Sequence, residues 1–225
     1  MPAHSETVPA PSQRMGGLLM GHMAAECVHA VAVLGIPDLL AGGRATIEAL
    51  ASTTGCHALS LQRVLRILVR FGVFTEPATG QFELTPVGAT LRSGTPDSLR
   101  DAAIFLMSAP MWASIGSLLD TLRSSEPAFV RLHKATIFAY LAGNPELATV
   151  FHDFMTTQSN AHNAAILDAY DFSGIGTVVD VGGGHGGLRS GGCSVSHGRA
   201  ARLAKRHAAP LRAHQIGRAS CRERV

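Results

Sequence analysis

A glycine-rich segment near residue 180 constrains the fold of this chain more than any other feature. The segment reads Thr177-Val-Val-Asp-Val-Gly-Gly-Gly-His-Gly-Gly-Leu188. Its β-branched residues lead to Asp180 and then to glycines, which predicts a buried parallel strand that runs into a tight loop. Glycine adopts positive φ and has no Cβ, so a ligand can approach the backbone closely. A helix that begins after the loop would point its free N–H groups at a polar ligand. The ligand would lie at the carboxyl end of the strand, where open α/β sheets bind ligands.

Two nucleotide-type ligands fit this loop. The spacing Gly182-x-Gly184-x-x-Gly187 satisfies the dinucleotide pattern. The spacing Asp180-x-Gly182-x-Gly184-x-Gly186 equally satisfies the motif of methyltransferases that use S-adenosylmethionine (SAM). In the second interpretation the glycine backbone packs along the amino-acid part of SAM, and Asp180 helps to hold its ammonium group. The carboxylate directly before the glycines favours SAM, and a plain glycine turn after a core strand is the alternative without a ligand.

The composition is that of a globular protein. Of the 225 residues 46% are hydrophobic, which is enough for one large domain or two small ones. We find no apolar run of membrane-spanning length, and residues 1–13 lack the features of a signal peptide and are expected to be a disordered lead-in. The four cysteines are scattered without metal-binding spacing. We therefore expect a cytoplasmic protein with reduced thiols, no metal site and no membrane partner.

The net charge of +3 conceals two unlike parts of the chain. Residues 189–225 hold nine of the nineteen Lys and Arg residues but only one of the sixteen Asp and Glu residues. Ten basic and fifteen acidic residues remain in residues 1–188, a net charge of −5. The main body therefore offers no electrostatic argument for nucleic acid or acidic lipid as a partner.

The first hundred residues predict a mainly helical domain with a small hairpin. Residues 14–34 are apolar almost all round, which predicts a helix buried on several sides or against a second subunit. Thr46 can cap a helix that runs to Ala51, and Ser60 can begin a second helix that runs to Arg70. Strands at 71–74 and 81–84 flank a turn, and a short helix follows at 86–91. Helix, turn, helix and hairpin form the winged-helix pattern.

The middle of the chain predicts further helices. Residues 98–124 are interpreted as two helices broken at Ala109-Pro110, and Pro145 begins a long helix that runs to about Tyr170. The apolar stripe of this long helix contains Leu147, Val150, Phe151, Phe154 and Met155.

The character of the sequence changes after Leu188. Residues 189–225 show no apolar periodicity, whereas a doubly wound domain needs several more strands and helices after the glycine loop. The last ten residues resemble the translation of a sequencing-adapter sequence, and residues 189–215 resemble a shifted reading frame. Our hypothesis is that 189–225 is a disordered, frameshifted tail; a genuine basic tail is the alternative.

Several blocks of sequence together resemble one family. They are Leu34-Gly-Ile-Pro-Asp-Leu-Leu40, Leu61-Gln-Arg-Val-Leu-Arg66, Gly72-Val-Phe74, Leu84-Thr-Pro-Val-Gly88, Ser125-Glu-Pro-Ala-Phe129, Tyr170-Asp-Phe172 and Val178-Val-Asp-Val-Gly-Gly-Gly-His-Gly-Gly187. In this order they resemble SAM-dependent O-methyltransferases with an N-terminal winged-helix dimerisation domain, a group that includes plant phenolic and bacterial natural-product enzymes.

The resemblance implies a fold and a division of the chain. The fold is a mainly α winged-helix dimerisation domain followed by the start of an α/β Rossmann-like methyltransferase domain. The implied segments are a lead at 1–13, the dimerisation domain at 14–107, a helical substrate-covering segment at 108–170, the first strand and glycine loop of the SAM domain at 171–188, and the tail at 189–225.

The resemblance also implies site residues and an activity. Asp180, Gly182, Gly184 and Gly186 match the first SAM motif, and Phe151 and Met155 match apolar residues that line the acceptor pocket, although their spacing alone also fits a helix core. The implied enzyme is a homodimer that methylates a hydroxyl of a small aromatic or polyketide-like acceptor. No residue of this chain matches the family's histidine base or the acid that holds the ribose, so we expect the 225-residue chain by itself to be inactive.

A regulator is the alternative function. Arg63, Arg66 and Arg70 share one face of the second winged-helix helix, where a DNA-binding winged-helix regulator with an appended ligand domain would contact DNA. The acidic main body argues against this alternative. A dinucleotide enzyme is a third possibility, but the chain lacks the acidic residue expected about 20 positions after the glycines.

Overall fold

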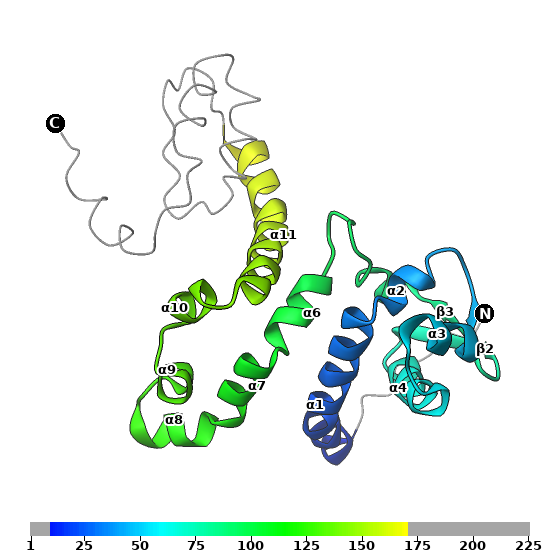
Figure 1. Cartoon of the computed structure of the whole chain (residues 1–225), viewed down its shortest axis with the longest axis horizontal. Coiled ribbons are helices and arrows are strands. Elements are labelled where there is room, and N and C mark those ends of the chain that lie inside the picture. Colours follow the sequence, from blue (N-terminus) through cyan, green and yellow to red (C-terminus); the bar gives the residue numbers. More distant parts are fainter. Residues whose placement is uncertain (1–9, 171–225) are drawn as a thin grey trace. The chain divides into compact units, whose positions relative to one another are not determined.

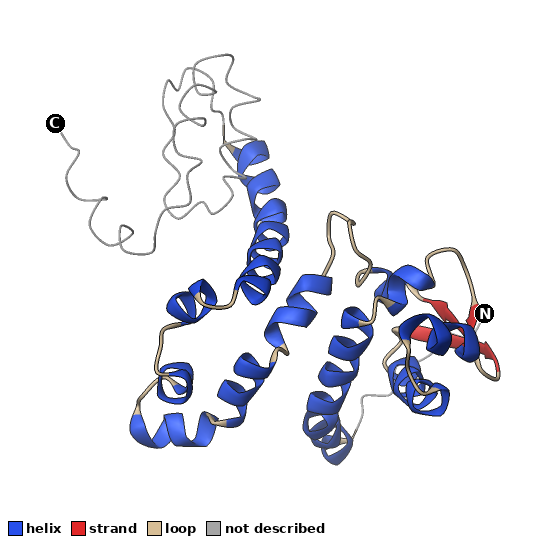
Figure 2. Ribbon diagram, in the orientation of Figure 1, coloured by secondary structure: helices blue, strands red, loops and turns tan. Residues whose placement is uncertain are grey.

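The computed structural model describes residues 10–170, and the chain is divided into two compact units, with the boundary between Met107 and Ser108 (Figures 1 and 2). Asp180 and the glycines of the predicted SAM loop lie outside the described residues, as does the predicted tail at 189–225. The described part is mostly helical with one small sheet, which confirms the predicted mainly α character of the N-terminal part.

The first unit contains six helices and three strands among its described residues. They are α1 (Pro11–Val33), α2 (Ile36–Leu39), β1 (Ala45–Thr46), α3 (Ile47–Thr54), α4 (Ala58–Arg70), β2 (Phe74–Ala78), β3 (Gln81–Leu84), α5 (Pro86–Ala89) and α6 (Arg100–Leu106). The order α3, α4, β2, β3 is the predicted winged-helix order. The short strand β1 and the helix α2 were not predicted.

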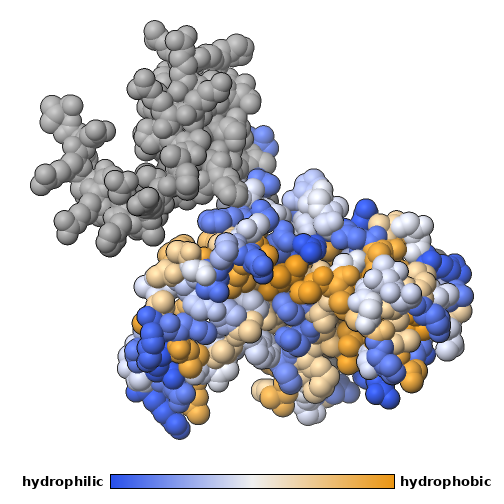
Figure 3. Space-filling view, viewed as in Figure 1, coloured by the Kyte–Doolittle hydropathy of each residue, from blue (hydrophilic) through white to orange (hydrophobic). Residues whose placement is uncertain are grey.

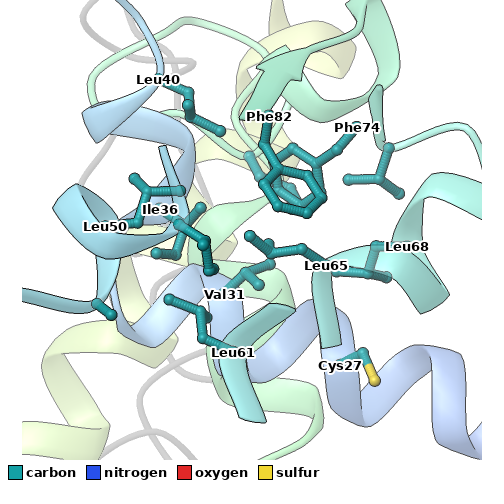
Figure 4. Close-up of a cluster of buried hydrophobic side chains, with 14 residues drawn as sticks. Cys27, Val31, Ile36, Leu40, Leu50, Leu61, Leu65, Leu68, Phe74 and Phe82 are labelled. Carbon is teal, nitrogen blue, oxygen red and sulfur yellow. The ribbon is translucent and has the colours of Figure 1, made fainter. Parts of the chain in front are cut away.

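One hydrophobic core holds this unit together (Figure 4). Leu61, Leu65 and Leu68 are buried at helical spacing along one face of α4. Phe74 and Phe82 bring rings into the same core from β2 and β3, and both are at most 1% exposed. The helix predicted from Ser60 to Arg70 is thus present, and three of its leucines line the core.

The sheet corrects one prediction. The first strand of the hairpin was expected at 71–74, but β2 runs from Phe74 to Ala78. The backbone of Gly72 and Val73 still bonds to the end of α4, with Gly72 at a φ of 70° and the Val73 N–H 3.0 Å from the Leu68 carbonyl. The strand can begin only after this helix cap. Pro77 is tolerated in β2 because that strand is at the edge of the β1-β3-β2 sheet and its register with β3 shifts there.

The cap of α3 was predicted correctly, but the end of the helix was not. Thr46 Oγ1 accepts a hydrogen bond from the Ala49 N–H at 3.3 Å, as expected for an N-cap. The helix was expected to stop at Ala51, whereas it continues to Thr54 and is ended by Gly55 at a φ of 69°. The hydroxyls of Thr53 and Thr54 bond back to carbonyls one turn earlier, so these residues extend the helix rather than break it.

Helix α1 exposes much of its apolar surface. Only its last turns are buried, at Cys27, Val31 and Ala32. The exposed large apolar side chains of its N-terminal half are Met15, Leu18, Leu19, Met20 and Met23. Figure 3 shows apolar side chains at the surface of the described part of the chain. A helix of this kind is expected to be covered by another molecule.

The same helix corrects a second prediction. We expected no membrane-length apolar segment, but α1 has 23 residues and its most apolar stretch has a mean hydropathy of 1.3. By length and composition alone it could cross a bilayer, because Arg14 and Glu26 are its only charged residues. Core helices of soluble proteins satisfy the same criterion, so this feature does not assign α1 to a membrane.

Glu76 joins the hairpin to α4. Its carboxylate accepts two hydrogen bonds from Arg66, from Nε and Nη2, each at 2.8 Å, and one from the Gly80 N–H at 2.8 Å. The hydrogen bonds from Arg66, followed by that from Gly80, lower the pKa of Glu76 to about 2. The carboxylate therefore stabilises the folded unit in its charged form.

This arrangement predicts a specific acid sensitivity. Because the pKa of Glu76 is lowered in the folded state, its stabilising contribution is complete above pH 4.5 and is lost as the pH falls from about 4.5 to 2. We expect Glu76→Gln to lower the thermal midpoint at pH 7 but not near pH 2, measured by circular dichroism. Asp97→Asn, at an exposed loop position, is the control and should keep the wild-type pH dependence. Equal losses in Glu76→Gln at both pH values would contradict this account.

The second unit contains five helices within its described residues. They are α7 (Ala109–Gly116), α8 (Leu118–Ser124), α9 (Ala128–His133), α10 (Ile137–Ala142) and α11 (Pro145–Ala169). The long helix α11 was predicted correctly, with Pro145 as its first residue. Residues 98–124 form three helices rather than two. The break falls at Met107 and Ser108, and Pro110 lies in the first turn of α7, where proline fits.

Two short helices of this unit, α9 and α10, were not predicted. Lys134 ends α9 in the left-handed conformation at a φ of 54°, a position where sequence patterns lead one to expect glycine. Arg131 of α9 reaches back to the junction of α7 and α8, where its Nη2 donates to Ser117 Oγ at 2.8 Å and lies 3.6 Å from Asp120. These contacts fix α9 against the two helices before it.

Candidate acceptor and cofactor sites

Phe151 and Met155 lie one helical turn apart on α11, so the structure places both predicted acceptor residues on one face of the helix. Phe151 is half-buried, and Met155 is 42% exposed. A thioether and an aromatic ring that remain partly accessible can contact an apolar ligand. Their role as acceptor contacts remains a prediction.

A third apolar side chain lies beside Phe151. The ring of Phe138 on α10 meets the ring of Phe151 nearly edge to face, with centroids 6.2 Å apart and an interplanar angle of 77°. Phe138 is 64% exposed. Sequence reasoning missed it because α10 itself was not predicted. The sequence did contain a pattern that indicates the start of this helix, a threonine followed directly by apolar residues. In the structure Thr136 caps α10 by accepting a hydrogen bond from the Ala139 N–H at 3.3 Å.

A separate aromatic cluster on α9 and α10 has a structural role. The rings of Phe129, His133 and Tyr140 lie 4.5 to 5.4 Å apart, and all three side chains are half-buried. His133 Nε2 lies 3.3 Å from the Pro110 carbonyl, which can only accept, so this nitrogen carries the proton. The cluster ties α9 and α10 to the start of α7.

Arg66 and Cys27 are side chains of chemical interest outside the acceptor residues. Arg66, on the face of α4 that would contact DNA, is bound on its guanidinium by Glu76. Cys27 is buried, and burial raises the pKa of its thiol, which makes it a poor nucleophile at neutral pH. Within residues 10–170 no group of three or more His, Cys, Asp or Glu side chains is placed to hold a metal ion.

The predicted cofactor residues Asp180, Gly182, Gly184 and Gly186 are not among the described residues, and their roles remain predictions.

Two family models match the chain in succession. The O-methyltransferase dimerisation domain matches residues 17–94, which include most of the first unit. The O-methyltransferase domain matches residues 114–194, from α7 through the glycine-rich segment. The second match ends six residues beyond Leu188, where we placed the start of the tail.

Individual O-methyltransferases also match this chain in sequence and in structure. The phenazine O-methyltransferase PhzM of Lysobacter antibioticus is 39% identical over 173 residues, which are 77% of this chain and 50% of that protein. The crystal structure of LaPhzM superimposes with a TM-score of 0.77 at 39% identity and covers 81% of this chain and 55% of that one. The chain thus spans about half the length of the curated relatives that it matches.

One solved relative contains bound ligands. The O-methyltransferase NcsB1 from neocarzinostatin biosynthesis, in complex with SAM and 2-hydroxy-5-methyl naphthoic acid, superimposes with a TM-score of 0.64 at 30% identity. That match covers 81% of this chain and 59% of the relative. None of these comparisons supports the alternative of a DNA-binding regulator. The chain belongs to the family of O-methyltransferases that carry an N-terminal dimerisation domain.

Proposed function

We propose that this protein is a SAM-dependent O-methyltransferase that methylates a hydroxyl of a small aromatic or polyketide-like acceptor. The observation that carries the proposal is the succession of the two family matches, with residues 180–186 inside the second. The relative with bound SAM and a hydroxylated naphthoic acid supports both the cofactor and the acceptor class.

The chain's own residues would bind and orient the two reactants. SAM supplies a methyl group on a positively charged sulfur. The acceptor oxygen forms a bond to the methyl carbon while the carbon–sulfur bond breaks, and S-adenosylhomocysteine leaves as a neutral thioether. Asp180 would pair with the ammonium group of SAM, and the backbone at Gly182, Gly184 and Gly186 would pack along its amino-acid part. Phe151 and Met155 would hold the acceptor ring, so that catalysis by these residues is mainly positioning.

The hydroxyl proton needs a base that we do not assign within this chain. The histidine that serves as the base in the family has no match in residues 1–188. We therefore place the base in the second half of the methyltransferase domain, which the matched relatives possess and this chain spans only in part.

We further propose that the protein is a cytoplasmic homodimer formed through residues 14–107. The exposed apolar face of α1 and the match to a dimerisation domain over residues 17–94 support the dimer. The acidic balance of residues 1–188 does not favour nucleic acid as a partner.

Substitutions in the glycine loop test the cofactor assignment. We propose a chimera that joins residues 1–188 to the second half of the Lysobacter antibioticus relative. In it, Asp180→Ala and Gly184→Val should each weaken SAM binding by about 1–3 kcal/mol, because one removes a charged partner and the other inserts a side chain between backbone and ligand. Calorimetry measures the affinity.

Met155→Ala is the matched control, because it should leave SAM affinity unchanged while it weakens acceptor binding. Unchanged SAM affinity in both loop variants would disprove the assignment of the glycine loop.

A further inference from the structure

Helix α10 presents aromatic rings on two different faces. Phe138 and Tyr140 are two positions apart, so their side chains leave the helix on nearly opposite sides. Tyr140 packs into the ring cluster of Phe129 and His133, whereas the ring of Phe138 meets Phe151 on α11. The two faces have different surroundings: Tyr140 is half-buried, and Phe138 is 64% exposed.

The contact with Phe151 fixes how the ring of Phe138 is presented. At an interplanar angle of 77° and a centroid separation of 6.2 Å, an edge of one ring meets the face of the other. This geometry is a favourable aromatic contact, so it restrains the ring rather than leaving it to rotate freely in solvent. Much of the Phe138 ring stays accessible beside a residue that we predict to contact the acceptor.

We infer that Phe138 is an additional acceptor-positioning residue, whose exposed ring stacks on the planar ring of a hydroxylated aromatic acceptor. This inference rests on the proposed function. Phe151 holds the Phe138 ring by the edge-to-face contact, and Met155, one turn further along α11, provides a polarisable apolar contact. Phe138 thus selects flat aromatic acceptors over aliphatic ones of similar size.

Single exposed apolar residues are common on protein surfaces, so exposure alone would not assign a role to Phe138. The assignment depends on the contact of Phe138 with Phe151, which is a predicted acceptor residue. Leu122 on α8 is 73% exposed, but it has no ring and lies on a helix without a predicted acceptor contact. It therefore provides a matched comparison for an exposed apolar side chain in the same unit.

The test uses the 225-residue chain without SAM. Methionine methyl groups are labelled with 13C, and the Met155 signal is assigned with Met155→Leu. Titration with 2-hydroxy-5-methyl naphthoic acid should shift the Met155 signal saturably, with a dissociation constant in the millimolar range. Phe138→Ala should raise this constant about 5-fold or more, the size expected for loss of one aromatic contact. Leu122→Ala should not change it.

Two further variants separate ring stacking from apolar volume. Phe138→Tyr should bind within about twofold of the wild type, because the ring is kept. Phe138→Leu should bind as weakly as Phe138→Ala. Wild-type affinity in Phe138→Ala or in Phe138→Leu, or no saturable shift in the wild type, would overturn the inference, provided that circular dichroism shows folded variants. Failure of the proposed function would appear separately, as an intact naphthoate response in this assay without SAM binding in the chimera.

Discussion

Replacement of Gly88 by alanine is expected to unfold most of the first unit. A Cβ atom at this position would lie 2.1 Å from the carbonyl oxygen of Val73 and 3.0 Å from the side chain of Leu84. Atoms cannot approach so closely, and the nearest one belongs to the backbone, which cannot rotate away as a side chain can. Overpacking of a buried site costs about 1–3 kcal/mol, and a clash with backbone belongs at the upper end of this range or above it.

The contact is close because hydrogen bonds of the Thr85 hydroxyl draw the start of α5 onto the residues that follow α4. Thr85 Oγ1 lies 2.6 and 2.9 Å from the carbonyl oxygens of Gly72 and Val73, which share its single proton, and it accepts from the Gly88 N–H at 3.1 Å. An alanine side chain would push α5 away and break this set. The buried carbonyl of Val73 would then lose a partner, which adds to the cost.

Urea unfolding of residues 1–107, followed by circular dichroism, measures this effect. Gly42→Ala is the control, because its Cβ would meet nothing within 4 Å and its φ is not positive, so it should keep the wild-type midpoint. In the whole chain the fluorescence of Trp112, the single tryptophan, reports on the second unit and should change little. A Gly88→Ala midpoint equal to that of the wild type would show that α5 is not packed as described.

Introducing charge on α1 should convert the proposed dimer into a monomer. Leu18 and Leu19 are 75% and 68% exposed in a single copy, so they gain most from being covered by a partner. Substitution of both by aspartate would place uncompensated carboxylates in the interface. Since an unpaired buried charge costs about 3–5 kcal/mol, we expect the dimer dissociation constant to rise at least about 100-fold.

Sedimentation of residues 1–107 at micromolar concentration tests this expectation. The wild-type unit should sediment as a dimer and the double variant as a monomer with the same circular dichroism. Leu59→Asp is a suitable control, because Leu59 is 60% exposed but lies in the first turn of α4, where an acidic residue is compatible with the helix. A folded wild-type monomer would argue that α1 has another role.

Local signals in the sequence predicted the regular helices well. The periodicity of α4, the threonine cap of α3 and the proline at the start of α11 each involve interactions within one helix, which a sequence pattern contains. Predictions failed where distant residues decide the structure. The start of β2 depends on how Gly72 and Val73 cap α4, and β1 exists because Ala45 and Thr46 pair with β3.

The same distinction applies to the candidate acceptor site. Phe151 and Met155 share a face of one helix, so spacing and family resemblance were sufficient to group them. Phe138 could not be grouped with them from the sequence, because its contact with Phe151 joins two helices separated by the turn at Gly143 and Asn144. The helix α9 ends at Lys134 in the left-handed conformation, where a glycine would have marked the end of a helix in the sequence. Without that glycine, the sequence did not show that this region divides into separate helices.

Methyl transfer by the chimera of residues 1–188 with the second half of the Lysobacter antibioticus relative tests the central claim most directly. The measurement is the rate at which a labelled methyl group passes from SAM to a hydroxyphenazine, compared between the parent chimera and its Gly184→Val variant. We predict methylated product from the parent and little or none from the variant. Equal rates in the two proteins, or a folded dimeric parent that neither binds SAM nor forms product, would contradict the assignment of this chain to SAM-dependent methyl transfer.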